Sequence, residues 1–284
     1  MKRYSSYFIA VAVAIALNNL ALWAIVRKQP ATVPLAALLA VETELNEQAG
    51  AGDADRKLLD ALYAAARLPV ERAEVLRRSC GLQHNLRGPR DAIAVCAQAL
   101  VIARTADQAT LQAVGRRMAK VLAGADDAAG ALTLLDSLPR AAEGLESVLT
   151  NWVRAETLRR LNRAPEALES AQRAYLDLEK AARADSSLGE YFAIADYELG
   201  RALAPTNPAA ARAALLRGLS LQRQLDAANP EYAEYRLFLA KILRELSHLP
   251  DGETAARSEF AREADELAAD LLRRDPRRWE DQGL

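Results

Sequence analysis

The first apolar pattern along the chain is a run of 20 uncharged residues, Tyr7 to Val26. As a helix rising about 1.5 Å per residue, this run is long enough to cross the hydrocarbon core of a bilayer. Two basic residues flank it on each side, as at the ends of many membrane spans: Lys2 and Arg3 before it, Arg27 and Lys28 after it. The pattern predicts an uncleaved signal anchor over residues 1–28.

Two alternatives to this membrane topology stay open. Cleavage after the small residues of Ala14-Ile15-Ala16 is one, although it would leave an apolar signal core of barely seven residues. Orientation is the other, because the basic flanks are nearly balanced and only the N-terminal amine favours a cytoplasmic N-terminus. Long downstream domains tend to be translocated, so we predict a single-pass protein of the bacterial inner membrane with a periplasmic domain, against a cytoplasmic alternative.

After the anchor the pattern changes from uniformly apolar to amphipathic. Two prolines in residues 29–34 predict a short stiff linker, because proline restrains the residue before it to extended geometry. From residue 35 to 284 apolar residues recur at spacings of three and four, which is typical of helices. Pro34 to Ala49 is expected to form one helix, and Asp53 is expected to cap a second that carries Leu58 and Leu62 on one stripe.

Short turn-forming segments then divide the chain into pairs of helices. They fall at residues 87–91, 124–127, 162–165, 205–208 and 250–253, and each contains Gly, Asn, Pro or Asp. Connections this short make neighbouring helices antiparallel, and the Ala-rich second helices allow close approach. The sequence predicts an all-α fold of about five helical hairpins, stacked as an irregular α-solenoid.

The hairpins carry small and large residues in a recurring order. Ala155 and Leu158 precede Ala167, Ala171 and Ala174, and Leu199-Gly200 and Ala256 with Phe260 repeat parts of the same order. In this the chain resembles the tetratricopeptide repeat family, which implies a solenoid that binds a protein or peptide in its groove. The alanines Ala92, Ala131, Ala167, Ala211 and Ala256 lie 39, 36, 44 and 45 residues apart rather than the family's 34, so an irregular helical bundle stays open.

Composition supports helix and a buried core. The chain has 51% hydrophobic but only 5% aromatic residues, and few β-branched segments. Beyond the four basic residues around the anchor, it carries 33 of the 37 basic and all 38 acidic side chains, a net charge of −5, which argues against a nucleic-acid partner. The arginine doublets are expected to be solvated helix ends: Arg77-Arg78, Arg116-Arg117, Arg159-Arg160 and Arg273-Arg274.

The sequence offers little material for catalysis. His84 and His248 are far apart and are expected to be cations or satisfied surface residues near helix ends. Phosphate-binding, dinucleotide-binding and metalloprotease motifs are missing, so we predict no enzyme, no metal site and no cofactor. Glu146-Ser147 and Glu169-Ser170 resemble the Glu-Ser pair of solenoid-shaped peptidoglycan-cleaving enzymes, but the Gly-rich motifs that accompany that pair are missing.

Two cysteines make the sharpest local hypothesis. Cys80 and Cys96 lie eight residues on either side of Gly88, so an antiparallel hairpin places them at the same height. In an oxidising compartment they would form a disulfide, and in a reducing one they would be two small buried thiols.

The function that fits these features is a membrane-anchored interaction scaffold or assembly factor of the cell envelope, holding a protein or peptide partner on its concave surface. A sensor module that binds a small ligand and a peptidoglycan-acting enzyme are the alternatives. The partner-binding residues are not predicted.

Overall fold

A computed structural model describes residues 52–140, 143–230, 232–250 and 252–274. Across these ranges the chain forms eleven α-helices, one short 3₁₀ helix and no β-strand. The predicted all-α class is therefore confirmed. The predicted anchor, the linker at 29–34, the helix at 34–49 and the chain from Asp275 onward lie outside the described residues.

Ten of the helices pair into five consecutive hairpins, whose turns are those predicted. Helix α3 (Gly52–Ala65) precedes them, and the 3₁₀ helix η1 (Ser186–Glu190) leads into the fourth hairpin. The hairpins are α4/α5 (Pro69–Arg87, Pro89–Ala103), α6/α7 (Gln108–Gly124, Ala128–Ser137), α8/α9 (Leu145–Arg160, Ala164–Ala184), α10/α11 (Tyr191–Leu203, Pro208–Ala228) and α12/α13 (Ala233–His248, Thr254–Arg274).

Local sequence explains where these helices begin. The side chains of Asp107, Asp127 and Asn207 accept hydrogen bonds from backbone N–H groups at Thr110, Gly130 and Ala210, over 2.7, 2.8 and 3.1 Å. Such caps satisfy N–H groups that the first turn of a helix leaves without a partner. Helix α3 departs from the expectation, because it begins at Gly52 and places Asp53 inside its first turn rather than at the cap.

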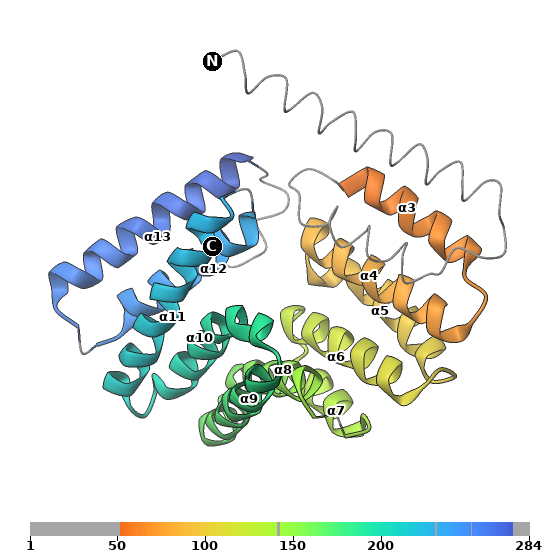
Figure 1. Ribbon diagram of the computed structural model, residues 1–284, viewed down its shortest axis with the longest axis horizontal. Helices are drawn as coiled ribbons and strands as arrows, with labels where there is room; N and C mark the ends of the chain where they lie inside the picture. Colours follow the sequence, from red (N-terminus) through yellow and green to blue (C-terminus); the bar gives the residue numbers. More distant parts are fainter. Residues whose placement is uncertain (1–51, 141–142, 231, 251, 275–284) are drawn as a thin grey trace, which may run out of the picture.

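The hairpins follow one another along a curve (Figure 1). The first helices of successive hairpins, α4, α6, α8, α10 and α12, contact one another and form the inner side of this curve. The second helices lie on the outer side, and each of the first four packs against the first helix of the next hairpin. Five helices from residues far apart in sequence therefore share one inner side.

Small residues allow the helices to approach closely. Ala92, Ala131, Ala167 and Ala211 on the second helices are fully or almost fully buried. A side-chain carbon added at Gly218 on α11 would lie 3.1 Å from the carbonyl oxygen of Ala193 on α10. Backbone packed against backbone leaves no space for a larger residue there, so these positions hold the hairpins at their observed separation.

The described helices include none with the length and apolar character needed to span a bilayer.

Candidate functional site

The structure joins Cys80 on α4 and Cys96 on α5 in a disulfide, with their Cα atoms 5.1 Å apart. Both residues are buried, at 0% and 1% exposure, among apolar side chains that include Met118 and Val121 of α6. Of the two states that the sequence allows, the structure has the bonded one. The bond crosses the first hairpin near the middle of both helices and so fixes α4 against α5.

Charged side chains gather where the inner helices approach the hairpin turns. We call this group the inner charged face. It comprises His84 on α4, Arg117 and Lys120 on α6, Glu156, Arg159 and Arg160 on α8, Glu198 and Arg201 on α10, and Lys241 and Glu245 on α12. It holds six cationic side chains against three carboxylates, in a domain whose sequence is net acidic.

Arg201 is the centre of one half of this face. Its guanidinium lies 2.9 Å from a Glu156 oxygen, 3.0 Å from a Glu245 oxygen and 3.6 Å from a Glu198 oxygen. The Arg201 side chain is only 13% exposed and its Cζ lies 5.0 Å from the Tyr197 ring centroid. One cation therefore links the first helices of three successive hairpins.

Burial and neighbouring charges set the pKa values of these carboxyl groups in opposite directions. Burial raises the pKa of Glu198, and the nearby Glu156 charge adds to this, while Arg201 only partly opposes it. Burial would also raise the pKa of Glu156, but Arg201 and Arg159 outweigh it and lower that pKa. Three carboxylates around one arginine are electrostatically crowded, so the group most deeply enclosed holds its proton most tightly.

The other half of the face consists of three cations that form no ion pair among the described residues: Arg117, Lys120 and Lys241. Glu156 and Glu198 still lie within electrostatic range of Lys120 and Lys241, and Glu74 within that of Arg117. Burial, together with Arg117 and Lys241, lowers the pKa of Lys120 to about 8, and burial lowers that of Lys241. Lys120 is nevertheless exposed to water. These three cations therefore repel one another on a surface that solvent reaches.

Arg117 also contacts α4. A side-chain carbon added at Gly81 would lie 3.5 Å from the Arg117 Cζ atom, so the absence of a side chain at Gly81 lets the guanidinium lie against α4. Burial lowers the Arg117 pKa to about 10, with the charges of Arg77 and Arg116 adding to the effect. Arg116, next in sequence, instead pairs with Glu146 of α8. The two residues of this doublet thus have different roles.

His84 is not the cation that its position near a helix end suggested. Burial and then the charges of Lys120, Arg117 and Lys241 lower its pKa to about 3, so the imidazole is neutral at neutral pH. Its Nδ1 atom is buried and has no hydrogen-bond partner among the described residues. His248, in contrast, is exposed at the end of α12. The imidazole of His84 stays neutral chiefly because burial disfavours its charged form, and also because a fourth positive charge beside three cations is costly.

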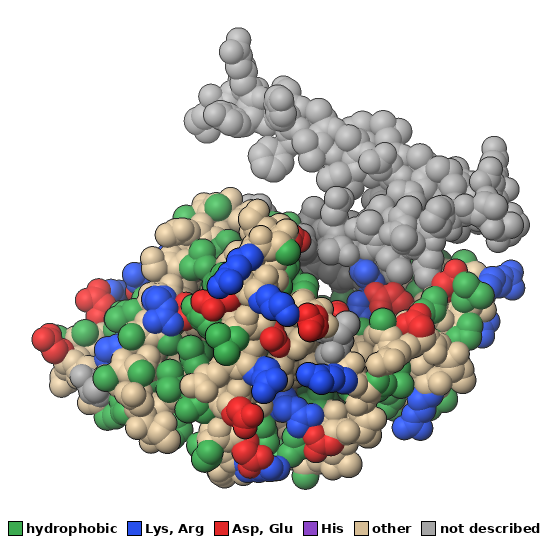
Figure 2. Space-filling model, turned by 60° about the horizontal axis from the view of Figure 1, so that its bottom comes forward, with side chains coloured by type: hydrophobic (Ala, Val, Ile, Leu, Met, Phe, Trp, Pro, Cys, Tyr) green, Lys and Arg blue, Asp and Glu red, His purple; other side chains and the backbone are tan. Residues whose placement is uncertain are grey.

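A second surface is a groove on the outer side, with a volume of about 870 Å³. Helix α7 has 10 residues while α9 has 21, so α7 leaves part of α8 uncovered. Residues of α8 such as Ser147 and Asn151 line the groove, the segment after α7 forms one wall and α9 the other. Charged side chains of both signs gather on this side of the molecule (Figure 2).

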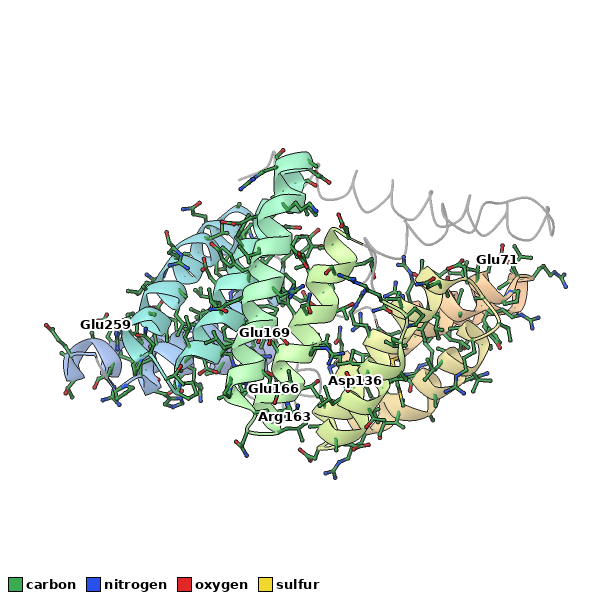
Figure 3. The ribbon with its side chains drawn as sticks, turned by 90° about the horizontal axis from the view of Figure 1, so that it is seen from below. Glu71, Asp136, Arg163, Glu166, Glu169 and Glu259 are labelled. Atoms are coloured by element: carbon green, nitrogen blue, oxygen red, sulfur yellow. A yellow bond between two sulfur atoms is a disulfide. The ribbon has the colours of Figure 1, made fainter. Side chains whose placement is uncertain are left out.

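Within the outer groove most charges are already paired. Arg154 lies 2.6 Å from Asp136, Lys180 lies 2.9 Å from Glu143, and Arg163 pairs with Glu166 (Figure 3). Ser147 donates a hydrogen bond to Asp177 over 2.5 Å. Most charges of the groove are thus paired within it, although Arg140 and Arg173, which also line it, form no ion pair among the described residues.

The two Glu-Ser pairs noted in the sequence lie apart. Glu146 on α8 pairs with Arg116, and Ser147 points to Asp177 in the groove. Glu169 lies on α9, exposed at the groove wall, while Ser170 is 8% exposed (Figure 3). No group of three or more potential metal ligands occurs within the part of the chain that the structure describes.

The inner charged face was missed in the sequence because its members come from five helices. The expectation of solvated helix ends holds for Arg159-Arg160 and Arg273-Arg274, which lie in the last turns of α8 and α13. It is wrong for Arg77-Arg78 and Arg116-Arg117, which lie near the middle of α4 and α6. The sequence did contain a signal for this face, since four of the five first helices, α6, α8, α10 and α12, carry charged residues three to seven positions before their turns.

No family model matches the chain, and no curated protein matches it significantly.

Proposed function

We propose that this chain is a membrane-anchored, tetratricopeptide-like scaffold that holds a protein or peptide partner against the inner side of its stacked hairpins. The observation that carries the proposal is the inner charged face, where four helices, α6, α8, α10 and α12, present six cations against three carboxylates. A surface with unbalanced charge selects and orients a complementary partner.

The outer groove supports this function less well. Its charges are mostly paired with each other, so a partner there would have to compete with existing ion pairs. The Cys80–Cys96 disulfide fits the proposed periplasmic location, because disulfides persist in oxidising compartments. The apolar run of residues 7–26 would supply the anchor.

The test is purification of the C-terminally tagged full chain from crosslinked, gently solubilised membranes, followed by mass spectrometry. Two double variants accompany the unaltered chain: Lys120→Glu with Lys241→Glu on the inner face, and Lys180→Glu with Arg183→Glu on the outer helix α9. Each changes the net charge equally. We expect one dominant stoichiometric partner with the unaltered chain and the outer variant, and its loss with the inner variant.

Two results contradict the proposal. If the unaltered chain yields no partner above background, the chain is not a scaffold. If the outer variant loses the partner while the inner variant keeps it, the partner binds the outer side. Circular dichroism of each variant shows whether its helices are intact, and Lys120 and Lys180 are both exposed, so substitution there leaves the core unchanged.

A further inference from the structure

Three cations of the inner charged face differ from the other basic residues around them. Arg77 and Arg78 share Glu74, Arg159 and Arg160 share Glu156, and Arg116 pairs with Glu146. The described residues supply no such carboxylate for Arg117, Lys120 or Lys241. Arg117 and Lys120 come from α6 and Lys241 comes from α12, so it is the stacking of the hairpins that brings these cations near one another.

Holding these three charges together costs folding free energy. Each lies within electrostatic range of at least one of the others, and protein around them displaces part of the water that would solvate them. Neutral residues at the same positions would remove this repulsion. Anionic groups bound beside these cations would offset the repulsion, since carboxylates accept charge-assisted hydrogen bonds from cationic donors.

The surroundings indicate what kind of anion fits. Next to the cations lie the carboxylates of Glu156 and Glu245, 23% and 31% exposed at their side chains. These accept hydrogen bonds and repel anions, so a ligand that reaches them must also donate. A peptide with acidic side chains offers both its carboxylates and its backbone N–H groups. Phosphate at neutral pH mainly accepts hydrogen bonds, so it suits only the cationic half of the inner charged face.

Lys241 adds an apolar element to the site. Its Nζ atom lies 5.9 Å from the ring centroid of Phe238, which packs against the main hydrophobic cluster of the C-terminal hairpins. Arg117 lies against Gly81 of α4. Both cations are thereby held in place by groups that carry no negative charge, and their remaining donors stay free for a ligand.

We propose that Arg117, Lys120 and Lys241 form a binding site for the carboxylates of an acidic peptide segment. This inference rests on the proposed function and names the chemistry of the partner: a stretch with several Asp or Glu side chains, lying across the inner side from α6 to α12.

The test uses the full chain in detergent and a fluorescein-labelled hexaglutamate peptide, with binding followed by fluorescence anisotropy at low salt. We expect saturable binding that weakens as salt rises. Lys120→Gln with Lys241→Gln should weaken binding about a hundredfold, because each of the two lost charge-assisted contacts contributes about tenfold. Lys120→Arg with Lys241→Arg should retain binding, and a matched outer variant, Lys180→Gln with Arg183→Gln, should bind within about twofold of the unaltered chain.

Three results overturn the inference: no binding of hexaglutamate, equal binding by the inner and outer Gln variants, or full displacement of the peptide by inorganic phosphate at concentrations comparable to its own. The last would indicate a site for a small anion. Failure here is distinguishable from failure of the scaffold proposal. A partner captured from membranes through the inner side, with no affinity for hexaglutamate, leaves the scaffold intact and refutes only the acidic chemistry.

Discussion

Reduction of the disulfide between Cys80 and Cys96 should lower the stability of the domain by a calculable amount. The two residues are 16 apart in sequence, so the bond closes a loop of about that length in the unfolded chain. With the chain-entropy relation, a loop of this length contributes about 10 cal/mol/K, or about 3 kcal/mol at 25 °C. For a domain of this size, about 2–4 °C per kcal/mol gives a fall in melting temperature of about 6–12 °C.

The assay is thermal unfolding of the full chain in detergent, followed by circular dichroism at 222 nm with and without a phosphine reductant. The variant Cys80→Ala with Cys96→Ala is the control, because reductant cannot change its melting temperature. Comparing oxidised with reduced protein isolates the crosslink, since both forms retain the same buried side chains. An unchanged melting temperature on full reduction, with both thiols shown to be alkylated afterwards, would refute the reasoning.

Three further predictions concern the packing and the inner charged face. Arg201→Ala should destabilise the domain by about 3–5 kcal/mol in urea unfolding, because it leaves the carboxyl groups of Glu198 and Glu245 without the cation that pairs with them. In the same assay Arg262→Ala, at an arginine 60% exposed, should change stability by less than about 0.5 kcal/mol. Gly218→Val should destabilise by about 1–3 kcal/mol through overpacking against α10. The same change at Gly189, where an added side-chain carbon would meet no other residue within 4 Å beyond its chain neighbours, should cost less than about 1 kcal/mol in the same assay. His84 has a pKa of about 3 in the folded chain and an ordinary value of 6.5, so between these pH values the unfolded chain binds more protons than the folded chain. The free energy of unfolding should therefore fall as the pH drops from 6.5 towards 3. His84→Gln should make the free energy of unfolding less dependent on pH in this range.

Helix boundaries could be predicted from the sequence because their causes are local. Asp127 and Asn207 cap helices with their own side chains, and Asn162 adopts the left-handed conformation, with a φ of 57°, that ends α8 in a tight turn. Each of these effects involves residues within a few positions of one another. The five turns were therefore visible without knowing how the hairpins stack.

The inner charged face could not be predicted in the same way. Arg201 meets Glu156 and Glu245, 45 and 44 positions away, only because α10 packs between α8 and α12. Sequence spacing places Arg117 on a helix but does not show which side of that helix faces inward. Because the repeats differ in length, the sequence also does not show which charged positions of successive hairpins lie side by side. Two arginines side by side in sequence, Arg116 and Arg117, consequently looked equivalent although one is paired and the other is not.

Site-specific photocrosslinking in membranes tests the central claim most directly. A photoreactive amino acid replaces one residue at a time in the otherwise unaltered full chain. One position is Arg160 on the inner side, which is close enough to Lys241 for its charge to lower the pKa of that lysine. The other is Arg183 on the outer helix α9. We predict that Arg160 gives one strong crosslink to the partner and that Arg183 gives none. A crosslink from Arg183 without one from Arg160 would contradict the claim that the inner side of the stack holds the partner.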